Sequence, residues 1–351
     1  MPNKKVAVII VSYNADRFIA DCFGSLGRAN HEGIDLQTIV IDNASKDGTV
    51  ERIRREYPWA TVVANPNNDG FAGGNNIGMR LAFEHGADYV YLLNHDTEVT
   101  PGFLIEAVRA MEADPAIGAA QSLLLLSPEK EKVNSTGNAL HFLGLGYCMD
   151  YRRPASAVDC QSVREIAYAS GAGVIYRVAA LRQVGLFDED FFMYHEDLDL
   201  CWRMRLAGWK NVIAPRSVVY HKYEFSKSIA KYYFMERNRY IVLLKNMQWR
   251  TLAVLAPFLA ASEVALFVAS VGGGWWRQKI KVYRHFLTAK AWRRIFEERR
   301  RVAAFRKIGD REATRLFTPT IAFQDVTGPF TQYVANPLMT ATWALVRRLY
   351  A

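Results

Sequence analysis

Short apolar runs alternate with amphipathic stretches along the first hundred residues of the chain. The apolar runs cover residues 6–11, 37–41, 61–64 and 89–93, and apolar positions at helical spacing cover residues 17–26, 50–57 and 78–85. Short continuous apolar runs are typical of strands that are buried on both faces of a parallel sheet. The recurring order of strand, polar turn and helix predicts βαβ units. We therefore expect an α/β fold in which helices cover both faces of a mostly parallel sheet.

Polar residues cluster where the predicted strands end. Ser12 and Asn14 follow the first run, Asp42 and Asn43 follow the second, and Asn94, His95 and Asp96 follow the fourth. Ligands of open α/β sheets bind at the carboxyl ends of the strands, so this coincidence indicates a ligand site. Asp42 can accept hydrogen bonds from a nucleobase or a ribose hydroxyl. The alternative is that these Asp and Asn residues cap the helices that follow them.

A stretch rich in glycine and asparagine, residues 67–78, follows the third run. It holds four glycines and four asparagines. Glycine lets the backbone approach a ligand closely, and side-chain amides can hydrogen-bond that ligand. The spacing is neither that of a P-loop nor that of a dinucleotide-binding fingerprint. We expect ligand contact here, with Gly70, Phe71 and Asn76 as candidates, and a plain surface loop as the alternative.

Two residues are candidate ligands of a divalent cation. Asp96 ends the cluster after the fourth run, and a carboxylate in this place can bind a hard cation that bridges two phosphates. The alternative for Asp96 is the cap of a helix. His221 follows another short apolar run, and a lone histidine is more often a satisfied core or surface residue than a ligand. His221 becomes a ligand candidate only if the fold brings the other sites to it.

Three carboxylates, Glu196, Asp197 and Asp199, lie at the start of a helix predicted from about residue 196. A carboxylate beside apolar side chains can have a raised pKa and serve as a general base. Glu196 and Asp199 share a helix face that Asp197 does not, so one carboxylate can face a pocket while another holds Arg203. Candidates for an acceptor-side wall, with core packing as the alternative, are Phe191, Tyr194 and Trp202.

Taken together, five motifs resemble family 2 glycosyltransferases. They lie in the family's order at residues 11–14, 41–49, 68–78, 94–96 and 195–203. The likeness is strongest to the rhamnosyltransferase-like branch, which builds bacterial cell-wall and surface polysaccharides. It covers roughly residues 5–245 and implies the GT-A fold, a Rossmann-like nucleotide-binding sheet. That fold agrees with the βαβ units predicted from the apolar pattern.

The resemblance also implies residue roles. It places Asp42 at the nucleobase and the Asn76 region at the nucleotide-sugar. Asp96 matches the last Asp of the family's D-x-D-type motif, and His221 matches a histidine that completes the metal or diphosphate site, which implies Mg²⁺ or Mn²⁺. Asp197 matches the catalytic base, with Glu196 as the alternative. Further donor-site candidates are Ser12, Asn14, Asn43, Gly70, Phe71 and Asn94.

The implied reaction is an inverting transfer from a nucleoside diphosphate sugar of dTDP or UDP type. Asp197 would take the proton from an acceptor hydroxyl, and one displacement needs no protein nucleophile. By resemblance the favoured donor is dTDP-L-rhamnose, with galactofuranose, GlcNAc and mannose donors as alternatives. The implied acceptor is a polyprenyl-linked or growing polysaccharide. Rival functions are a catalytically silent scaffold with this fold, a nucleotidyltransferase and a nucleic-acid-binding protein.

The net charge of +9 is concentrated in one part of the chain. Residues 241–351 carry 18 basic and 6 acidic residues, whereas residues 1–240 carry 26 and 29. We therefore expect a nearly neutral catalytic domain over residues 1–240 and a basic, mostly helical region over residues 241–351. Basic and aromatic residues interleave between residues 277 and 315, which favours an anionic membrane surface as partner and argues against nucleic acid.

Residues 251–270 are apolar except for Glu263, and they include Pro257. About twenty apolar residues can span a bilayer, but a central carboxylate argues against a span. The catalytic domain and the basic region also both belong on the cytoplasmic side. We therefore expect a peripheral or monotopic protein at the cytoplasmic face of the cell membrane, held by an interfacial or re-entrant helix. The alternatives are a span and a buried core or dimer helix, the latter making a homo-oligomer.

The last residues predict an amphipathic helix. Asn336 and Pro337 suit its N-cap and first position. The expected apolar face of this helix consists of Leu338, Ala341, Leu345 and Leu349.

Overall fold

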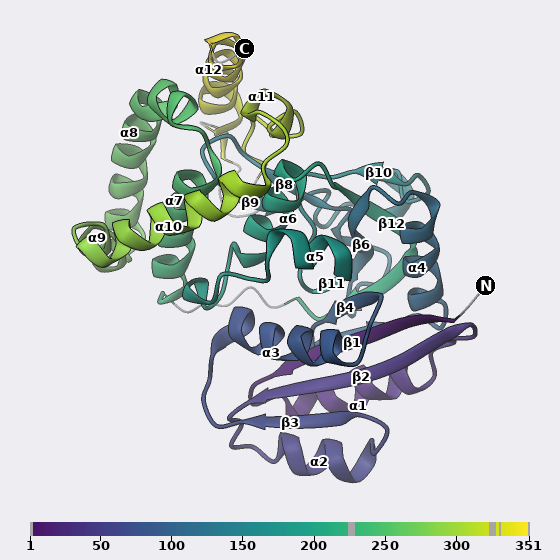
Figure 1. The fold of residues 1–351 in the computed structure, drawn as a ribbon. Helices are drawn as coiled ribbons and strands as arrows, with labels where there is room; N and C mark the ends of the chain where they lie inside the picture. Colours follow the sequence, from purple (N-terminus) through teal and green to yellow (C-terminus); the bar gives the residue numbers. More distant parts are fainter. Residues whose placement is uncertain (1–2, 224–228, 323–327, 330, 350–351) are drawn as a thin grey trace. The chain divides into compact units, whose positions relative to one another are not determined.

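The structure, a computed structural model, describes residues 3–223, 229–322, 328–329 and 331–349 (Figure 1). It divides into two compact units. Unit 1 comprises Met1–Asn138, Cys148–Met204 and Trp209–Glu224, and unit 2 comprises Ala139–Tyr147, Arg205–Gly208 and Phe225–Ala351. The boundary expected at residue 240 falls inside helix α7 (Lys231–Asn246). Each unit is described by itself.

Unit 1 is built on a 10-stranded mixed sheet. Its main path has the order β10-β12-β6-β11-β4-β1-β2-β3, with β5 paired to β12 and β7 paired to β6. Strands β1 to β4 are mutually parallel where they pair, whereas β11 is antiparallel to both of its neighbours. The strands are β1 (Lys4–Ser12), β2 (Ile34–Asn43), β3 (Thr61–Asn65), β4 (Tyr89–Leu93), β5 (Thr97–Val99), β6 (Ile117–Leu126), β7 (Val133–Ser135), β10 (Arg164–Glu165), β11 (Gly173–Arg177) and β12 (Lys210–His221).

Helices cover both faces of this sheet, which confirms the predicted fold class (Figure 1). The helices of unit 1 are α1 (Asp16–Gly27), α2 (Thr49–Glu56), α3 (Gly70–Glu84), α4 (Phe103–Ala113), α5 (Val178–Val184) and α6 (Glu196–Leu206). Val6, Val8 and Ile10 of β1 pack in one core cluster with α1, α2 and α4. Successive side chains of a strand point to opposite faces, so Ile9 and Val11 face the other side, where α3 packs.

The stretch rich in glycine and asparagine differs from its prediction. We expected a loop followed by a helix over residues 78–85, but α3 begins at Gly70. Its glycines face the sheet: a Cβ on Gly74 would lie 2.9 Å from Val11 Cγ1, and one on Gly78 would lie 2.5 Å from Ile9 Cγ2. Glycine has a low helix propensity, but the close packing of α3 on β1 leaves no room for a side chain at these positions.

Unit 2 is mainly helical, as expected of the C-terminal region. Besides α7, its helices are α8 (Trp249–Gly272), α9 (Trp276–Phe286), α10 (Ala289–Phe305), α11 (Asp310–Ala313) and α12 (Asn336–Leu349). A short two-stranded sheet consists of β8 (Asn138–Leu140) and β9 (Gly146–Cys148). Helix α7 packs against α9 and α10, and α8 packs against α9.

Helix α12 forms over Asn336–Leu349. Of the apolar face expected to meet a membrane or a partner, Leu338, Leu345 and Leu349 are exposed. Trp343 and Val346 are buried, and Trp343 stacks on Phe142 with ring centroids 5.0 Å apart. Asn336 was expected as the N-cap but is the first helical residue, and its side chain bonds the backbone N and O of Ile321.

Candidate active site

The carboxyl ends of β1 and β2 lie side by side, and Ser12 is in register with Asp42. Asp42 is buried. Its Oδ2 accepts hydrogen bonds from Ser12 Oγ (2.8 Å) and Ser45 Oγ (2.5 Å), and its Oδ1 accepts one from the Ser45 amide (2.9 Å). Asn14 extends the network. Its side-chain Oδ1 accepts a hydrogen bond from the backbone amide of Lys46, and its backbone amide donates one to Ser45 Oγ. A carboxylate accepts about four hydrogen bonds, so Asp42 retains little capacity for a nucleobase.

Two other donor-site candidates bind the chain itself. Asn43 Nδ2 donates to the Gly70 carbonyl (2.8 Å), which ties the end of β2 to the start of α3. Asn76 is buried, and its Nδ2 donates to Phe187 O and to Glu189 Oε1, both at 2.9 Å. Asn76 Oδ1 accepts from the Phe187 amide (3.0 Å). With both of its N–H donors used, the Asn76 side chain positions the 187–189 segment and offers no free donor to a nucleotide-sugar.

Phe71 contributes an aromatic face. A Cβ on Gly171 would lie 2.8 Å from Phe71 Cζ, so the ring packs directly on the backbone of Gly171. The same Cβ would lie 4.0 Å from Asp197 Cβ. Gly171 therefore lies between Phe71 of α3 and the first turn of α6, and its missing side chain lets the two elements approach.

The segment before α6 is held in a strained conformation. Phe192, Tyr194 and His195 have φ of 62°, 68° and 71°, values that L-residues rarely adopt. The first turn of α3 fixes it, since the Ala72 amide donates to the Phe192 carbonyl (3.1 Å). Gly70 is part of the same contact, because a Cβ there would lie only 2.4 Å from Phe192 O. Such strain persists only where the surrounding structure enforces it, and here it sets the start of the helix that carries the carboxylates.

Asp197 is a partly buried carboxylate held by backbone amides. Its Oδ2 accepts from the Gly171 amide (3.1 Å) and its Oδ1 from the Leu198 amide (2.7 Å). Burial raises the pKa of Asp197 to about 6, against the lowering effect of these hydrogen bonds. At neutral pH the carboxylate is therefore mostly ionised yet close to its pKa, the condition that suits a general base.

The two neighbouring carboxyl groups have different surroundings. Burial, and then the charge of Asp197, raise the pKa of Glu196 well above its ordinary value. Within the described residues its buried Oε2 has no hydrogen-bond partner. Asp199 pairs with Arg203 Nε (2.8 Å) in the core, and Arg203 also donates to the carbonyls of Val184 and Leu186. Of the three carboxylates at the start of α6, Asp199 thus has a structural role.

Asp96 and His221 come together because β5 pairs with β12, opposing Thr97 to His221. Asp96 Oδ1 lies 3.3 Å from His221 Nε2. Asn134 Oδ1 lies 2.9 Å from His221 Nδ1, a contact that orients the imidazole ring. Burial opposes ionisation of Asp96, but the neighbouring His221 holds the pKa of Asp96 below its ordinary value.

This pair fits a cation that is shared with a ligand. Within the described residues Asp96 Oδ1 is buried without a hydrogen-bond partner, and it lies beside His221 Nε2, so two side chains of types that bind cations are adjacent. No group of three His, Cys, Asp or Glu side chains in the described part of the chain can hold a metal alone. Mg²⁺ and similar cations in nucleotide sites commonly have one or two protein ligands and take the rest from phosphates and water. Asn94 lies two residues away, and its amide donates to Ala172 O (3.1 Å).

The structure also decides some roles that the sequence left open. Phe191 and Trp202 are buried in the core and therefore line no acceptor surface, whereas Tyr194 is partly exposed. Asn134 and Ser45 were missed as site residues. Ser45 lies inside a motif that the sequence exposes, but Asn134 follows no motif, and only the pairing of β6 with β7 brings its strand to the site.

Residues 7–185 match the sequence model of Glycosyl transferase family 2, and the chain belongs to this family. Over 232 residues it is 28% identical to the N-acetylglucosaminyl-diphospho-decaprenol L-rhamnosyltransferase of Mycobacterium tuberculosis. That match covers 61% of this chain and 75% of the relative. The protein is thus a glycosyltransferase, and the sugar that it transfers comes from a nucleotide-sugar.

Solved structures show the same GT-A-like fold. The crystal structure of GalNAc-T7 with UDP, GalNAc and Mn²⁺ superposes with a TM-score of 0.58 at 16% identity, over 74% of this chain and 51% of that chain. The mannosyltransferase PcManGT of Pyrobaculum calidifontis, in complex with GDP-Man and Mn²⁺, superposes with a TM-score of 0.51 at 17% identity. That match covers 85% of this chain and 86% of the other.

Proposed function

We propose that this protein is an inverting glycosyltransferase that moves L-rhamnose from dTDP-rhamnose to a hydroxyl of a lipid-linked or growing surface polysaccharide. The 28% identity to a rhamnosyltransferase whose named acceptor is a diphospho-decaprenol supports both the sugar and the lipid-linked acceptor. The observation that carries the catalytic part is the state of Asp197. Its pKa is raised to about 6, and it is bonded to Gly171, two residues before β11, which pairs with the carboxyl end of β4.

In this proposal Asp197 accepts the proton of the acceptor hydroxyl while that oxygen attacks the anomeric carbon. The amides of Gly171 and Leu198 keep the carboxylate oriented before and after proton transfer. Phe71 and the 192–195 segment shield the carboxylate from water and so keep it basic. One base and no nucleophile give a single displacement, which inverts the anomeric configuration.

The donor lies at the ends of β1, β2 and β4. The buried network of Ser12, Asn14 and Asp42 shapes the wall for the nucleobase, and backbone groups of this wall are the contacts we expect. Asp96 and His221 would hold Mg²⁺ or Mn²⁺, which would neutralise charge on the departing nucleoside diphosphate. The Nδ1 contact of His221 with Asn134 orients the imidazole ring for that role.

We place the enzyme at the cytoplasmic face of the membrane as a monotopic protein. Among the described residues, α8 is long and apolar enough to cross a bilayer, but length and composition alone do not make it a span. Its central carboxylate, Glu263, is bonded by Lys279 Nζ (2.5 Å) and Tyr283 OH (2.5 Å), which belong to α9. A helix tied along one side to a basic helix, with an apolar outer side, suits the membrane interface.

The test compares Asp197→Asn with Glu196→Gln in transfer from labelled dTDP-rhamnose to a polyprenyl-diphosphate-linked sugar. Asp197→Asn should lower kcat by about 10²- to 10⁴-fold, the usual contribution of a general base. Glu196→Gln keeps the size of the side chain and leaves Asp197 in place, so it should keep most of the activity. Stabilisation of both variants by dTDP or UDP in thermal melting is the control for an intact donor site.

The reverse ranking of the two variants would assign the base to Glu196. Full activity of Asp197→Asn would overturn the general-base mechanism. A wild type that is active only with another nucleotide-sugar would overturn the rhamnosyl assignment and leave the mechanism standing.

A further inference from the structure

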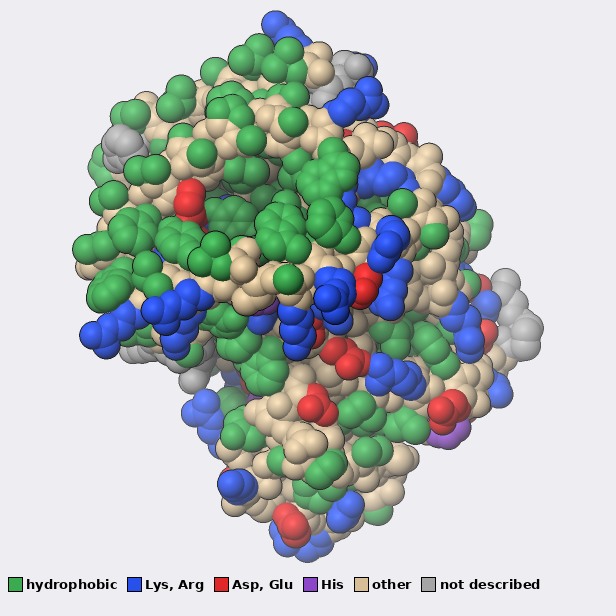
Figure 2. All heavy atoms as spheres, turned by 60° about the vertical axis from the view of Figure 1, so that its left-hand side comes forward, with side chains coloured by type: hydrophobic (Ala, Val, Ile, Leu, Met, Phe, Trp, Pro, Cys, Tyr) green, Lys and Arg blue, Asp and Glu red, His purple; other side chains and the backbone are tan. Residues whose placement is uncertain are grey.

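Unit 2 contains an apolar pocket of about 300 Å³ between α7, α8, α9 and α10, here called the α8 pocket. Its walls include Tyr240, Leu244, Leu259, Val282, Phe286 and Trp292. Figure 2 shows hydrophobic side chains gathered around a hollow on this face, with basic side chains along its lower border. The volume is at the lower end of the range for small-ligand sites, and the lining is more apolar than most of them.

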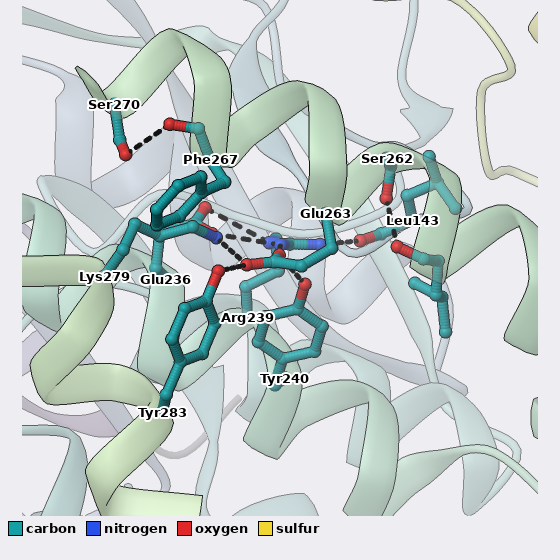
Figure 3. Close-up of polar contacts among 11 residues, drawn as sticks. Leu143, Glu236, Arg239, Tyr240, Ser262, Glu263, Phe267, Ser270, Lys279 and Tyr283 are labelled. Carbon is teal, nitrogen blue, oxygen red and sulfur yellow. Dashed lines mark hydrogen bonds and ion pairs between the residues drawn. The ribbon is translucent and has the colours of Figure 1, made fainter. Parts of the chain in front are cut away.

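The floor of the α8 pocket consists of acidic and basic side chains that form ion pairs with one another. Glu263 of α8 points between α7 and α9, where it meets Lys279 and Arg239 Nη2 (3.5 Å), as Figure 3 shows. Glu236 completes the set, with Arg239 at 3.0 Å and Lys279 at 2.7 Å. Tyr240 and Tyr283 donate their hydroxyls to Glu263.

Two carboxylates and two cations thus compensate each other. The floor groups described here are already engaged, so an entering polar ligand would lose its hydration without finding new partners. A peptide would bring backbone N–H and C=O groups with the same cost. The α8 pocket therefore selects for hydrocarbon.

A path of aromatic rings leads from the α8 pocket to the surface. Ring centroids are 6.0 Å apart for Tyr240 and Phe286, 6.4 Å for Phe286 and Trp292, and 6.1 Å for Trp292 and Phe296. The path ends at Trp249, 6.0 Å from Phe296 and 50% exposed. Exposed Trp side chains prefer the boundary between hydrocarbon and water, so this end of the path marks where a ligand leaves the apolar layer.

The surroundings of the path are basic. On α9 and α10 the exposed basic residues include Arg277, Lys281, Arg284, Lys290 and Arg293. The outer side of α8 is apolar and exposed, with Val264 at 68% and Val268 at 65%. An amphiphile with a long hydrocarbon chain and an anionic head complements both features at once.

We infer that the α8 pocket binds the isoprenoid chain of the lipid-linked acceptor, with the diphosphate of that lipid among the basic residues of α9 and α10. This inference rests on the proposed function for the identity of the lipid. The chain fills the hollow and lies along the aromatic path, while the glycan head is left free in water. The α8 pocket would thereby select acceptors by their lipid and leave the choice of sugar to the catalytic domain.

The test places a bulky side chain in the α8 pocket without truncating any side chain of the hydrophobic core. Ala260 lines the pocket and is exposed on α8, and Ala265 is exposed on the same helix outside the lining. Transfer is measured with one glycan diphosphate carried on either a polyprenyl chain or a short water-soluble alkyl chain. Ala260→Trp should lower the ratio of kcat/KM for the long over the short acceptor by about tenfold, the effect of losing roughly two buried methylenes. Ala265→Trp should leave that ratio unchanged.

A second measurement does not depend on catalysis. A polyprenyl phosphate bearing a diazirine is photocrosslinked to the full-length protein, and the labelled residues are located by mass spectrometry. Labels should fall on the α8 pocket, and unlabelled polyprenyl phosphate should compete while phosphatidylglycerol does not. Equal competition by phosphatidylglycerol, labels elsewhere, or an unchanged acceptor ratio in Ala260→Trp would overturn the inference. Labelled pocket residues in a protein that transfers no rhamnose would overturn the proposed function alone.

Discussion

At the scale of single residues, the carboxyl groups at the start of α6 differ because their surroundings differ. Asp197 receives two backbone amides, Glu196 has one carboxyl oxygen without a hydrogen-bond partner among the described residues, and Asp199 receives a guanidinium. For Asp197 and Glu196, burial raises the pKa and hydrogen bonds from backbone amides oppose that rise.

The pH dependence of activity should report Asp197. Because the base must be ionised, kcat/KM should rise with pH up to about 6 and then level off. A pH–rate profile with a solvent-matched buffer series measures this. A profile that is flat down to about pH 4, the ordinary range of an aspartate, would contradict the raised pKa.

The free energy of unfolding should fall as pH rises over the range in which kcat/KM rises. The folded-state pKa of Asp197 lies above its ordinary value of 3.8, so ionisation destabilises the fold as pH rises from about 4 to about 6. Asp197→Asn removes this penalty. Its melting temperature relative to wild type should therefore be higher above pH 6 than near pH 4, as thermal melts at both pH values would show. A difference that shrinks with rising pH would be the wrong sign.

Asp96 should control the metal-dependent part of donor binding. Mn²⁺ together with UDP should stabilise the wild type more than UDP alone, and Asp96→Asn should abolish that extra shift in thermal melting. Glu98→Gln is the matched control, because Glu98 lies nearby on β5 and pairs with Lys130 at 2.9 Å. An unchanged Mn²⁺ effect in Asp96→Asn would remove Asp96 from the cation site.

At the scale of elements, the start of α3 positions the segment that precedes the catalytic carboxylates. The Asn43 amide fixes Gly70, and Gly70 in turn touches the Phe192 carbonyl. The contact joins the second strand of the sheet to the turn before α6 through the Asn43 side chain and the Gly70 backbone. In the proposed mechanism, this contact helps to position Asp197.

A comparison of Gly70→Ala with Gly86→Ala separates the effect of backbone strain from the effect of losing the contact between Gly70 and Phe192. Both glycines have positive φ, 69° and 74°, so alanine should cost roughly 1–2 kcal/mol at either position. Only at Gly70 would the new Cβ overlap a neighbour, Phe192 O at 2.4 Å, whereas Gly86 has open space. Urea unfolding should show both losses, the larger at Gly70, and kcat/KM should fall at Gly70 alone. Equal kcat/KM for the two variants would mean that the contact does not position the base.

At the scale of the whole molecule, charge and apolar surface are concentrated in the same part of the sequence. Residues 241–351 hold the net positive charge, and the exposed outer side of α8 belongs to the same part. This coincidence supports the proposal that the basic part of the chain contacts an anionic membrane.

A charge on the outer side of α8 should release the protein from vesicles. Val268→Glu places a carboxylate on a side chain that is 65% exposed, where insertion into a bilayer would bury it. Flotation with phosphatidylglycerol-containing liposomes should show a loss of about tenfold or more in bound protein, from a cost of a few kcal/mol. Val163→Glu, at a 55% exposed position in unit 1, is the control and should bind as wild type does. Equal flotation of Val268→Glu would exclude this side of α8 from the membrane contact.

The sequence by itself determined the order of strands and helices over the first hundred residues, because strands buried on both faces leave continuous apolar runs and the turns between them are polar. It also placed four of the five family motifs after predicted strands and the fifth at the start of a helix, and it concentrated the positive charge in the last third. These features are local in the chain or follow from its order, so no three-dimensional information was needed to find them.

Only the tertiary structure decided how the side chains are used. Asn76 and Asp42 are engaged by the chain itself, Asn134 reaches His221 from a strand without a motif, and Glu263 is neutralised by residues of two other helices. The split between Asp197 and Glu196 likewise depends on burial and on amides supplied by distant segments. Hydrogen bonding and desolvation are set by neighbours in space, and the order of residues along the chain does not encode those neighbours directly.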